Sequence, residues 1–200
     1  DRALAPYTDV AIAVSASTAE FTTRARLVPA ERTHVVYLGA PLDEFARPRS
    51  ADEIAAARAA LGIPAGAVAI GSVTRLMPYK GNEFLVGAAP AVLAAHPEAR
   101  FYLVGEGELE APLRAQAAGL GLGDRFVFAG FRSDVAAAFS AFDLVVFPSL
   151  WEGTPLTAFE ALAMGKPIVS TDADGLLDVL ADGRDALVVP KRDSPALAAA

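Results

Sequence analysis

The feature that most constrains this fold is a set of short apolar runs that recur along the chain from residue 68 onward. Within each run the apolar residues are mostly consecutive and do not alternate with polar ones. Strands that helices cover on both faces show this pattern, whereas strands with one wet face alternate. The runs are VAIGSV (68–73), RFYLVG (100–105), RFVFAG (125–130), DLVVFPS (143–149), KPIVST (166–171) and DALVVP (185–190).

Helix-like segments separate these strands, and this alternation predicts the α/β fold class. Strands and helices in regular succession favour parallel pairing with right-handed crossovers. We therefore predict a doubly wound parallel sheet of the Rossmann-like kind. The expected helices cover about 82–96, 109–122, 133–142, 155–164, 175–182 and the residues from 194 onward.

The start of the chain predicts a smaller unit. We expect a strand at about 10–14 and another at about 33–38. Between them we expect a helix that ends near Leu27, with Ser17 or Thr18 as its N-cap, because a hydroxyl can accept a hydrogen bond from the first free N–H groups.

A polar stretch, residues 41–53, carries two prolines and is interpreted as a linker. A helix follows it and ends near Gly62. The predicted domains are therefore residues 1–45, as the tail of a preceding domain with its linker, and residues 46–200, as a second domain truncated at its last helix.

Composition argues against several classes of function. A net charge of −7 is unsuited to nucleic acid, whose binding depends on cationic side chains. The chain has no cysteine, which excludes thiolate metal sites and fits a reducing compartment such as the cytoplasm. The only histidines, His34 and His96, are too few for a histidine metal cluster, and we assign neither a catalytic role. No apolar run is long enough to cross a membrane.

The loops that follow the strands are the expected place for a ligand, because doubly wound sheets bind ligands at the carboxyl ends of their strands. The loop GSVTRLMPYKGN contains Arg75 and Lys80. Two cations near the start of a helix can converge on a diphosphate. The alternative is that both are ordinary solvated cations on the surface.

Two further strand ends carry glycines. Gly105 and Gly107 follow one strand and would permit close approach of a ligand to the backbone, although an ordinary turn explains them equally well. They are not a dinucleotide fingerprint, because Glu110 stands where that motif requires its third glycine. Gly130 and Phe131 end the next strand, where a flat base could stack or a bare turn could lie.

The stretch PSLWEGTPLTAFEALAMGKP (148–167) holds two carboxylates, Glu152 and Glu160. We expect the helix to begin at Pro155, which leaves the N–H groups of Thr154, Leu156 and Thr157 free for a ligand. Glu160 is flanked by apolar residues, and burying its charge is costly unless something pairs with it. Glu152 could instead offset the helix dipole, and Glu160 could pair with a neighbouring cation.

Taken together these loops resemble one family, the retaining nucleotide-sugar glycosyltransferases of family 4, which have the GT-B fold. Four short motifs of that family occur here in the family's order. They are GSVTRLMPYKG for the pattern G-x-x-x-R-L-x-x-x-K-G, LVGEGE for a V-G-x-G turn, FAGF for a G-F turn, and the stretch 148–167 for a Glu-x(7)-Glu motif. The resemblance extends over about residues 10–195 and implies the C-terminal, donor-binding half of the fold.

The resemblance also implies roles for residues of these motifs. Arg75 and Lys80 would hold the donor diphosphate, Glu160 would accept hydrogen bonds from the ribose, and Gly130 and Phe131 would lie near the base. Glu152 would meet the transferred sugar, with Arg75 and Lys80 as the other catalytic residues. The implied donor-binding set also contains Gly71, Gly105, Glu106, Gly153, Thr154, Pro155 and Leu156, of which Pro155 has no N–H to offer.

The implied reaction is transfer of a sugar from a nucleoside diphosphate sugar to a carbohydrate or lipid-linked acceptor, with retention and without a cofactor or metal. The missing N-terminal domain would supply the acceptor site, so we expect this fragment to bind donor but to transfer poorly. Peripheral association with the inner face of a membrane is left open. So are two other functions, a non-catalytic nucleotide-binding module and a sugar-nucleotide epimerase.

Overall fold

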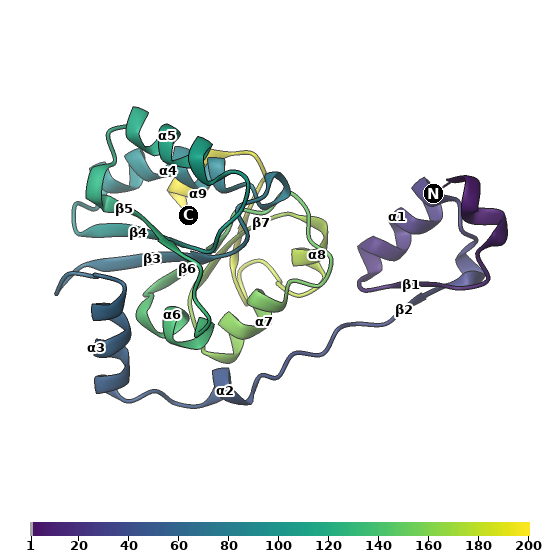
Figure 1. The fold of residues 1–200 in the computed structure, drawn as a ribbon, viewed down its shortest axis with the longest axis horizontal. Coiled ribbons are helices and arrows are strands. Elements are labelled where there is room, and N and C mark those ends of the chain that lie inside the picture. The colour runs from purple at the N-terminus through teal and green to yellow at the C-terminus, as the bar shows by residue number, and fades with distance from the viewer. Residues whose placement is uncertain (1) are drawn as a thin grey trace.

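The computed structural model describes residues 2–200, and its main body is the parallel α/β sheet that the sequence predicts (Figure 1). Six strands pair in parallel in the order β5-β4-β3-β6-β7-β8. The predicted strands all form, each within two residues of its expected start. They are β3 (Val68–Val73), β4 (Ala99–Val104), β5 (Phe126–Gly130), β6 (Leu144–Phe147), β7 (Ile168–Thr171) and β8 (Leu187–Val189).

Helices cover both faces of this sheet, which explains the continuous apolar runs. In β6, Val145 packs in the core on one face while Val146 packs in the core on the other. One face carries α4 (Asn82–Ala95), α5 (Glu110–Gly119) and α9 (Ser194–Ala199), and the other carries α3 (Ala51–Ala60), α6 (Val135–Ala141), α7 (Leu156–Ala163) and α8 (Asp174–Leu177) (Figure 1).

The strand order creates a switch point between β3 and β6. From β3 the chain winds outward through β4 to β5, and then returns to place β6 on the other side of β3. The loops that follow β3 and β6 therefore leave neighbouring strands in opposite winding directions, and a crevice opens there in doubly wound sheets. Here the loops touch, because the N–H of Leu150 donates to the carbonyl of Tyr79 at 2.8 Å.

The N-terminal residues form a small separate sheet. Strands β1 (Ala11–Ala13) and β2 (Thr33–Val35) pair in parallel, with α1 (Ala16–Arg26) between them in sequence. Short 3₁₀ turns precede β1 and β2 at Arg2–Tyr7 and Ala30–Arg32. The predicted caps of α1, Ser17 and Thr18, are wrong: Ser15 is the N-cap, and its hydroxyl accepts from the N–H of Thr18.

An extended segment leads from this unit to the large sheet (Figure 1). The predicted linker, 41–53, is less open than expected, because α2 (Asp43–Ala46) forms within it and α3 begins before it ends. Phe45 of α2 is buried in the core against the large sheet. The boundary expected between residues 45 and 46 thus falls inside a helix that packs on the second domain, and the division into 1–45 and 46–200 stays a prediction.

The two parts also touch near the site loops. The hydroxyl of Thr154 donates to the carbonyl of Val14, and the N–H of Ala16 donates to the carboxylate of Asp178 at 3.1 Å. Among residues 2–200 no helix has the length and apolar character that a membrane span requires.

The contact between the two switch-point loops depends on Gly81. Its φ is +61°, and an added Cβ would lie 2.1 Å from the carbonyl oxygen of Pro148. We expect Gly81→Ala to lower the free energy of unfolding by more than the roughly 1–2 kcal/mol of left-handed strain alone. Gly62→Ala is the matched control, because φ there is +66° with nothing within 4 Å. Urea denaturation of both variants checks this, and equal losses would show that the Pro148 contact is unimportant.

Candidate functional site

The centre of the site is an ion pair that joins the two switch-point loops. The amine of Lys80 lies 2.6 Å from one oxygen of the Glu152 carboxylate and 2.8 Å from the other. The Glu152 side chain is 9% exposed and that of Lys80 15%, so both charges are largely removed from water. The sequence placed these residues on separate ligand groups, but in this structure they bind one another.

Ser149 is a third member of this cluster, and sequence reasoning missed it. Its hydroxyl donates to the Glu152 carboxylate at 2.6 Å, and Ser149 is 3% exposed. Its own carbonyl accepts from the hydroxyl of Thr171 on β7. A polar residue directly after a buried strand was the signal available, since buried hydroxyls nearly always have a partner.

Arg75, the second predicted cation, lies apart from this pair on the exposed side of its loop. It donates to the hydroxyl of Tyr79 at 2.5 Å, and its guanidinium lies 5.8 Å from the Tyr79 ring centroid. Tyr79 in turn meets Trp151 edge-on at 6.3 Å. The amine of Lys80 lies 5.5 Å from the same centroid, so both cations are within cation–π distance of the Tyr79 ring.

A cavity of about 500 Å³ opens at the carboxyl ends of β3, β4 and β5. Four predicted donor-binding residues line it: Arg75, Gly105, Glu106 and Phe131. Phe131 is 68% exposed, so its ring is available for stacking. The other lining residues are Val73, Thr74, Met77, Val104, Gly107, Arg132, Val135 and Thr157.

Packing within the protein explains why position 105 is a glycine, without any need for a ligand. An added Cβ there would lie 1.8 Å from the carbonyl oxygen of Thr74, so the turn after β4 packs backbone-to-backbone against the β3 loop. Gly130 does not line the cavity; its carbonyl accepts from the N–H of Gly105 at 2.8 Å. Gly71 lies inside β3, against the ring of Phe142, and does not reach the strand end.

Glu160, the second carboxylate of this motif, has a different environment from Glu152. It is half-buried on α7, and burial raises the pKa of its carboxyl. Among residues 2–200 its carboxylate has neither a hydrogen bond nor an ion pair, so the alternative of pairing with a nearby cation does not hold. Thr157, three residues earlier and hence on the same helix face, lines the cavity.

The entrance of α7 differs from the prediction. The helix begins at Leu156, and Pro155 is its N-cap residue instead of its first helical residue. The N–H of Leu156 donates to the carbonyl of Thr154 at 3.0 Å, so this group is not free for a ligand as expected. The hydroxyl of Thr154 donates to the carbonyl of Val14. Gly153 lies in the same turn, where an added Cβ would be 3.2 Å from the Val14 side chain.

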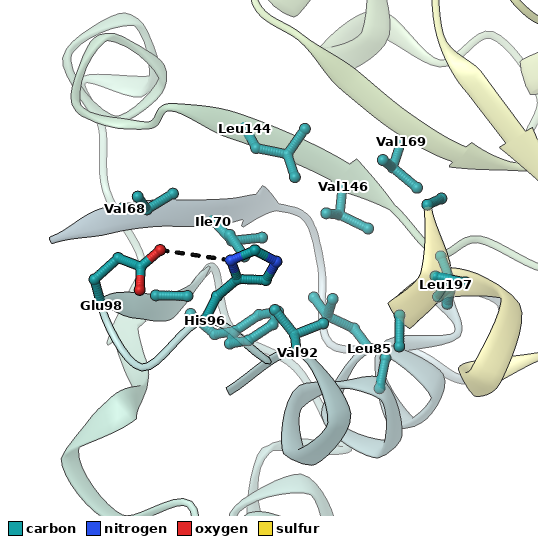
Figure 2. A pocket seen from close by; sticks show the side chains of 16 residues that line it. Val68, Ile70, Leu85, Val92, His96, Glu98, Leu144, Val146, Val169 and Leu197 are labelled. Atoms are coloured by element: carbon teal, nitrogen blue, oxygen red, sulfur yellow. Dashed lines mark ion pairs between the residues drawn. The ribbon is translucent and has the colours of Figure 1, made fainter. Parts of the chain in front are cut away.

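A second cavity of about 300 Å³ lies at the amino ends of the strands, between the sheet and α4 and α9. Its lining is apolar apart from His96 and Glu98, which pair at 3.5 Å (Figure 2). The His96 side chain is 65% exposed. Because doubly wound sheets bind ligands at the opposite edge and this cavity has few polar groups to orient one, we regard the 500 Å³ cavity as the candidate site.

Metal ligands are not gathered anywhere in the part of the chain that the structure describes: it contains no cluster of three or more histidine, aspartate or glutamate side chains suited to an ion.

Comparison with known proteins decides the family. The family described as "Glycosyl transferases group 1" matches residues 67–200, which contain the whole six-stranded sheet. The chain belongs to this family. The match includes all four motif loops of this glycosyltransferase-family chain.

Individual relatives agree with that assignment. The chain is 34% identical over 179 residues to a 2-deoxystreptamine N-acetyl-D-glucosaminyltransferase of Streptomyces fradiae. This match covers 88% of the chain and 42% of the relative. It is 37% identical over 180 residues to a D-inositol 3-phosphate glycosyltransferase of Geodermatophilus obscurus, with 84% and 39% covered. This family member thus spans about 40% of the length of such relatives.

Among solved structures, HepE of Anabaena in complex with UDP and glucose superposes with a TM-score of 0.87. The two are 28% identical, and the match covers 98% of this chain and 53% of HepE. The fold of the glycosyltransferase-family chain, including its small N-terminal unit, therefore follows that of a GT-B protein.

Breaking the Lys80–Glu152 pair should reveal how far it is buried. We expect Lys80→Met to destabilise the fold by about 3 kcal/mol, because an unpaired carboxylate then stays in a low-dielectric site. The double variant Lys80→Met with Glu152→Gln should recover most of this loss. Chemical denaturation of the four proteins in the cycle measures the coupling, and additive losses would place both groups in water.

Glu160 predicts an opposite, pH-dependent effect. Because burial raises the folded-state pKa of Glu160, its ionisation opposes folding above the unfolded-state pKa. We expect Glu160→Gln to have the higher urea midpoint at pH 7, with the advantage shrinking as pH falls toward about 4, where the unfolded carboxyl also protonates. Glu108→Gln, at an exposed position, is the control and should change the midpoint at neither pH.

Proposed function

We propose that this chain is the donor-binding half of a retaining family 4 glycosyltransferase, which transfers a sugar from a nucleoside diphosphate sugar to a carbohydrate or lipid-linked acceptor. The observation that carries the proposal is the meeting of the two loops at the switch point. Arg75 of the β3 loop lines the cavity, and Lys80 of the same loop contacts Glu152 of the β6 loop at 2.6 Å. A nucleotide sugar needs both kinds of group, since its phosphates accept hydrogen bonds and its hydroxyls donate them.

The diphosphate would be held by Arg75 and Lys80. Arg75 lines the cavity with an exposed guanidinium, and Lys80 is five residues further along the same loop. As catalytic residues they would stabilise the charge that develops on the leaving diphosphate. The proposal needs no metal, because two cations oppose the phosphates. The UDP found in HepE supports a uridine nucleotide as the first donor to test.

The nucleoside would lie along the rest of the cavity. Glu160 is a half-buried acceptor without a protein partner, which suits a pair of ribose hydroxyls. Phe131 would stack on the base, with Gly130 next to it in the chain, and Gly105 and Glu106 line the same cavity.

The transferred sugar would lie beside Glu152 and the turn from Gly153 to Leu156. Glu152 is the third catalytic residue of the proposal, as the group that orients the sugar. The N-terminal domain would supply the acceptor site, and the unit around β1 and β2 would belong to that domain. Cytoplasmic location, with or without contact to the inner membrane face, is part of the same proposal and rests on the cysteine-free composition.

Binding of fragments of the donor tests this assignment most simply. We expect Arg75→Ala to weaken binding of both UDP and pyrophosphate by about 1.5–3 kcal/mol, the range for a charge-assisted hydrogen bond. Glu160→Gln should weaken UDP and leave pyrophosphate unchanged, because it faces the ribose. Titration calorimetry measures both.

Arg24→Ala is the matched control, since Arg24 is a cation on α1 with an 80% exposed side chain. If Arg75→Ala binds UDP as tightly as the Arg24 variant does, the proposed diphosphate site is wrong. Turnover of the donor with no acceptor into an epimerised sugar would point to the epimerase alternative instead.

A further inference from the structure

The proposed phosphate site is already occupied by an anion of the protein itself. The amine of Lys80 contacts both oxygens of Glu152, so its charge is neutralised before a donor arrives. A diphosphate that binds Lys80 therefore competes with this carboxylate for the amine. Loss of this ion pair reduces the net free energy that any phosphate ligand gains by binding Lys80.

Of the two partners, Glu152 is the one held in place. Its carboxylate keeps the hydrogen bond from Ser149 at 2.6 Å, and Ser149 is tied to β7 through Thr171. Its backbone is fixed as well, because a Cβ on Gly175 of α8 would lie 2.4 Å from the Glu152 carbonyl. Lys80 is attached by a long flexible stem to a loop, so Lys80 is the partner that moves.

The consequence differs for ligands with and without a sugar. A nucleoside diphosphate removes Lys80 and leaves a buried carboxylate with Ser149 as its one donor. The remaining acceptor positions of the carboxylate are then unfilled, which is costly for a charge withdrawn from water. A nucleoside diphosphate sugar carries hydroxyl donors on its far side that can take the place of the amine.

We propose, on the basis of the function proposed above, that Glu152 makes this site prefer the sugar-bearing donor over the bare diphosphate, and that Ser149 is the positioning residue that retains Glu152 for the sugar. The preference would favour capture of donor and release of the diphosphate product. A purely structural ion pair would affect folding but would not distinguish the two ligands.

The test compares UDP with UDP-glucose, and GDP with GDP-mannose, by titration calorimetry on the chain; the pair that binds wild type more tightly is then used. We expect Glu152→Gln to bind the bare diphosphate at least about threefold more tightly and the nucleotide sugar no more tightly than wild type. The preference for the sugar-bearing ligand should fall by roughly tenfold, which corresponds to about 1.4 kcal/mol.

Ser149→Ala should weaken the nucleotide sugar several-fold and change the bare diphosphate by less than twofold. Ser140→Ala is its matched control: Ser140 is 5% exposed, and its hydroxyl donates to Ala137 within its own helix, so neither ligand should be affected. If Glu152→Gln does not fold, Glu152→Asp keeps the charge but withdraws it from Lys80, and should shift the preference in the same direction by a smaller factor.

The outcomes separate this inference from the proposed function. If wild type binds the nucleotides but the Glu152 variants keep the wild-type preference, or bind the bare diphosphate less tightly, the inference is wrong and the function stands. If wild type binds none of the four nucleotides, the proposed function fails and this inference with it.

Discussion

The candidate site depends on one contact across the switch point, the ion pair between Lys80 and Glu152. These residues are 72 positions apart, and only the return of the chain from β5 to β6 brings their loops together. The backbone supports the contact independently of the charges. Tyr79 accepts from both Leu150 and Trp151, and Gly81 packs on Pro148. The side chains therefore meet on a scaffold that is already fixed.

The two glutamates of the same motif differ in whether their carboxylates have partners. Glu152 is buried but fully engaged, with a cation and a hydroxyl within hydrogen-bond distance. Glu160 is only half-buried, yet its carboxylate has no partner in the described chain, and burial raises its pKa. An engaged acid holds the loops together, and an unengaged one near a cavity costs stability. Perturbed groups of the second kind gather at functional sites.

The sheet could be predicted from sequence because its physics is local. A continuous apolar run needs no partner to be recognised, and β3 forms over the expected 68–73. The helix caps were harder, since several adjacent hydroxyls compete: Ser15, not Ser17 or Thr18, caps α1. Phe45 packs into the core from a segment that reads as a linker, because an isolated aromatic gives no periodic signal.

The site could be predicted as a list of loops but not as a set of contacts. The loops that carry Arg75, Lys80 and Glu152, and the helix that carries Glu160, were identified from their position after strands. The pairing of Lys80 with Glu152 and the anchoring of Ser149 by Thr171 depend on how distant segments pack, whereas the use of the Leu156 N–H depends on the local turn at Thr154. A side chain that can bind either a ligand or a neighbour looks the same in both cases from sequence alone.

The most direct measurement is a crystal structure of the chain with UDP bound. We expect the diphosphate to lie between Arg75 and Lys80, the amine of Lys80 to move from Glu152 to a phosphate oxygen, and the ribose hydroxyls to bind Glu160. UDP in the apolar cavity beside His96, or at the switch point with the Lys80–Glu152 pair intact and the phosphates directed away from it, would contradict this expectation.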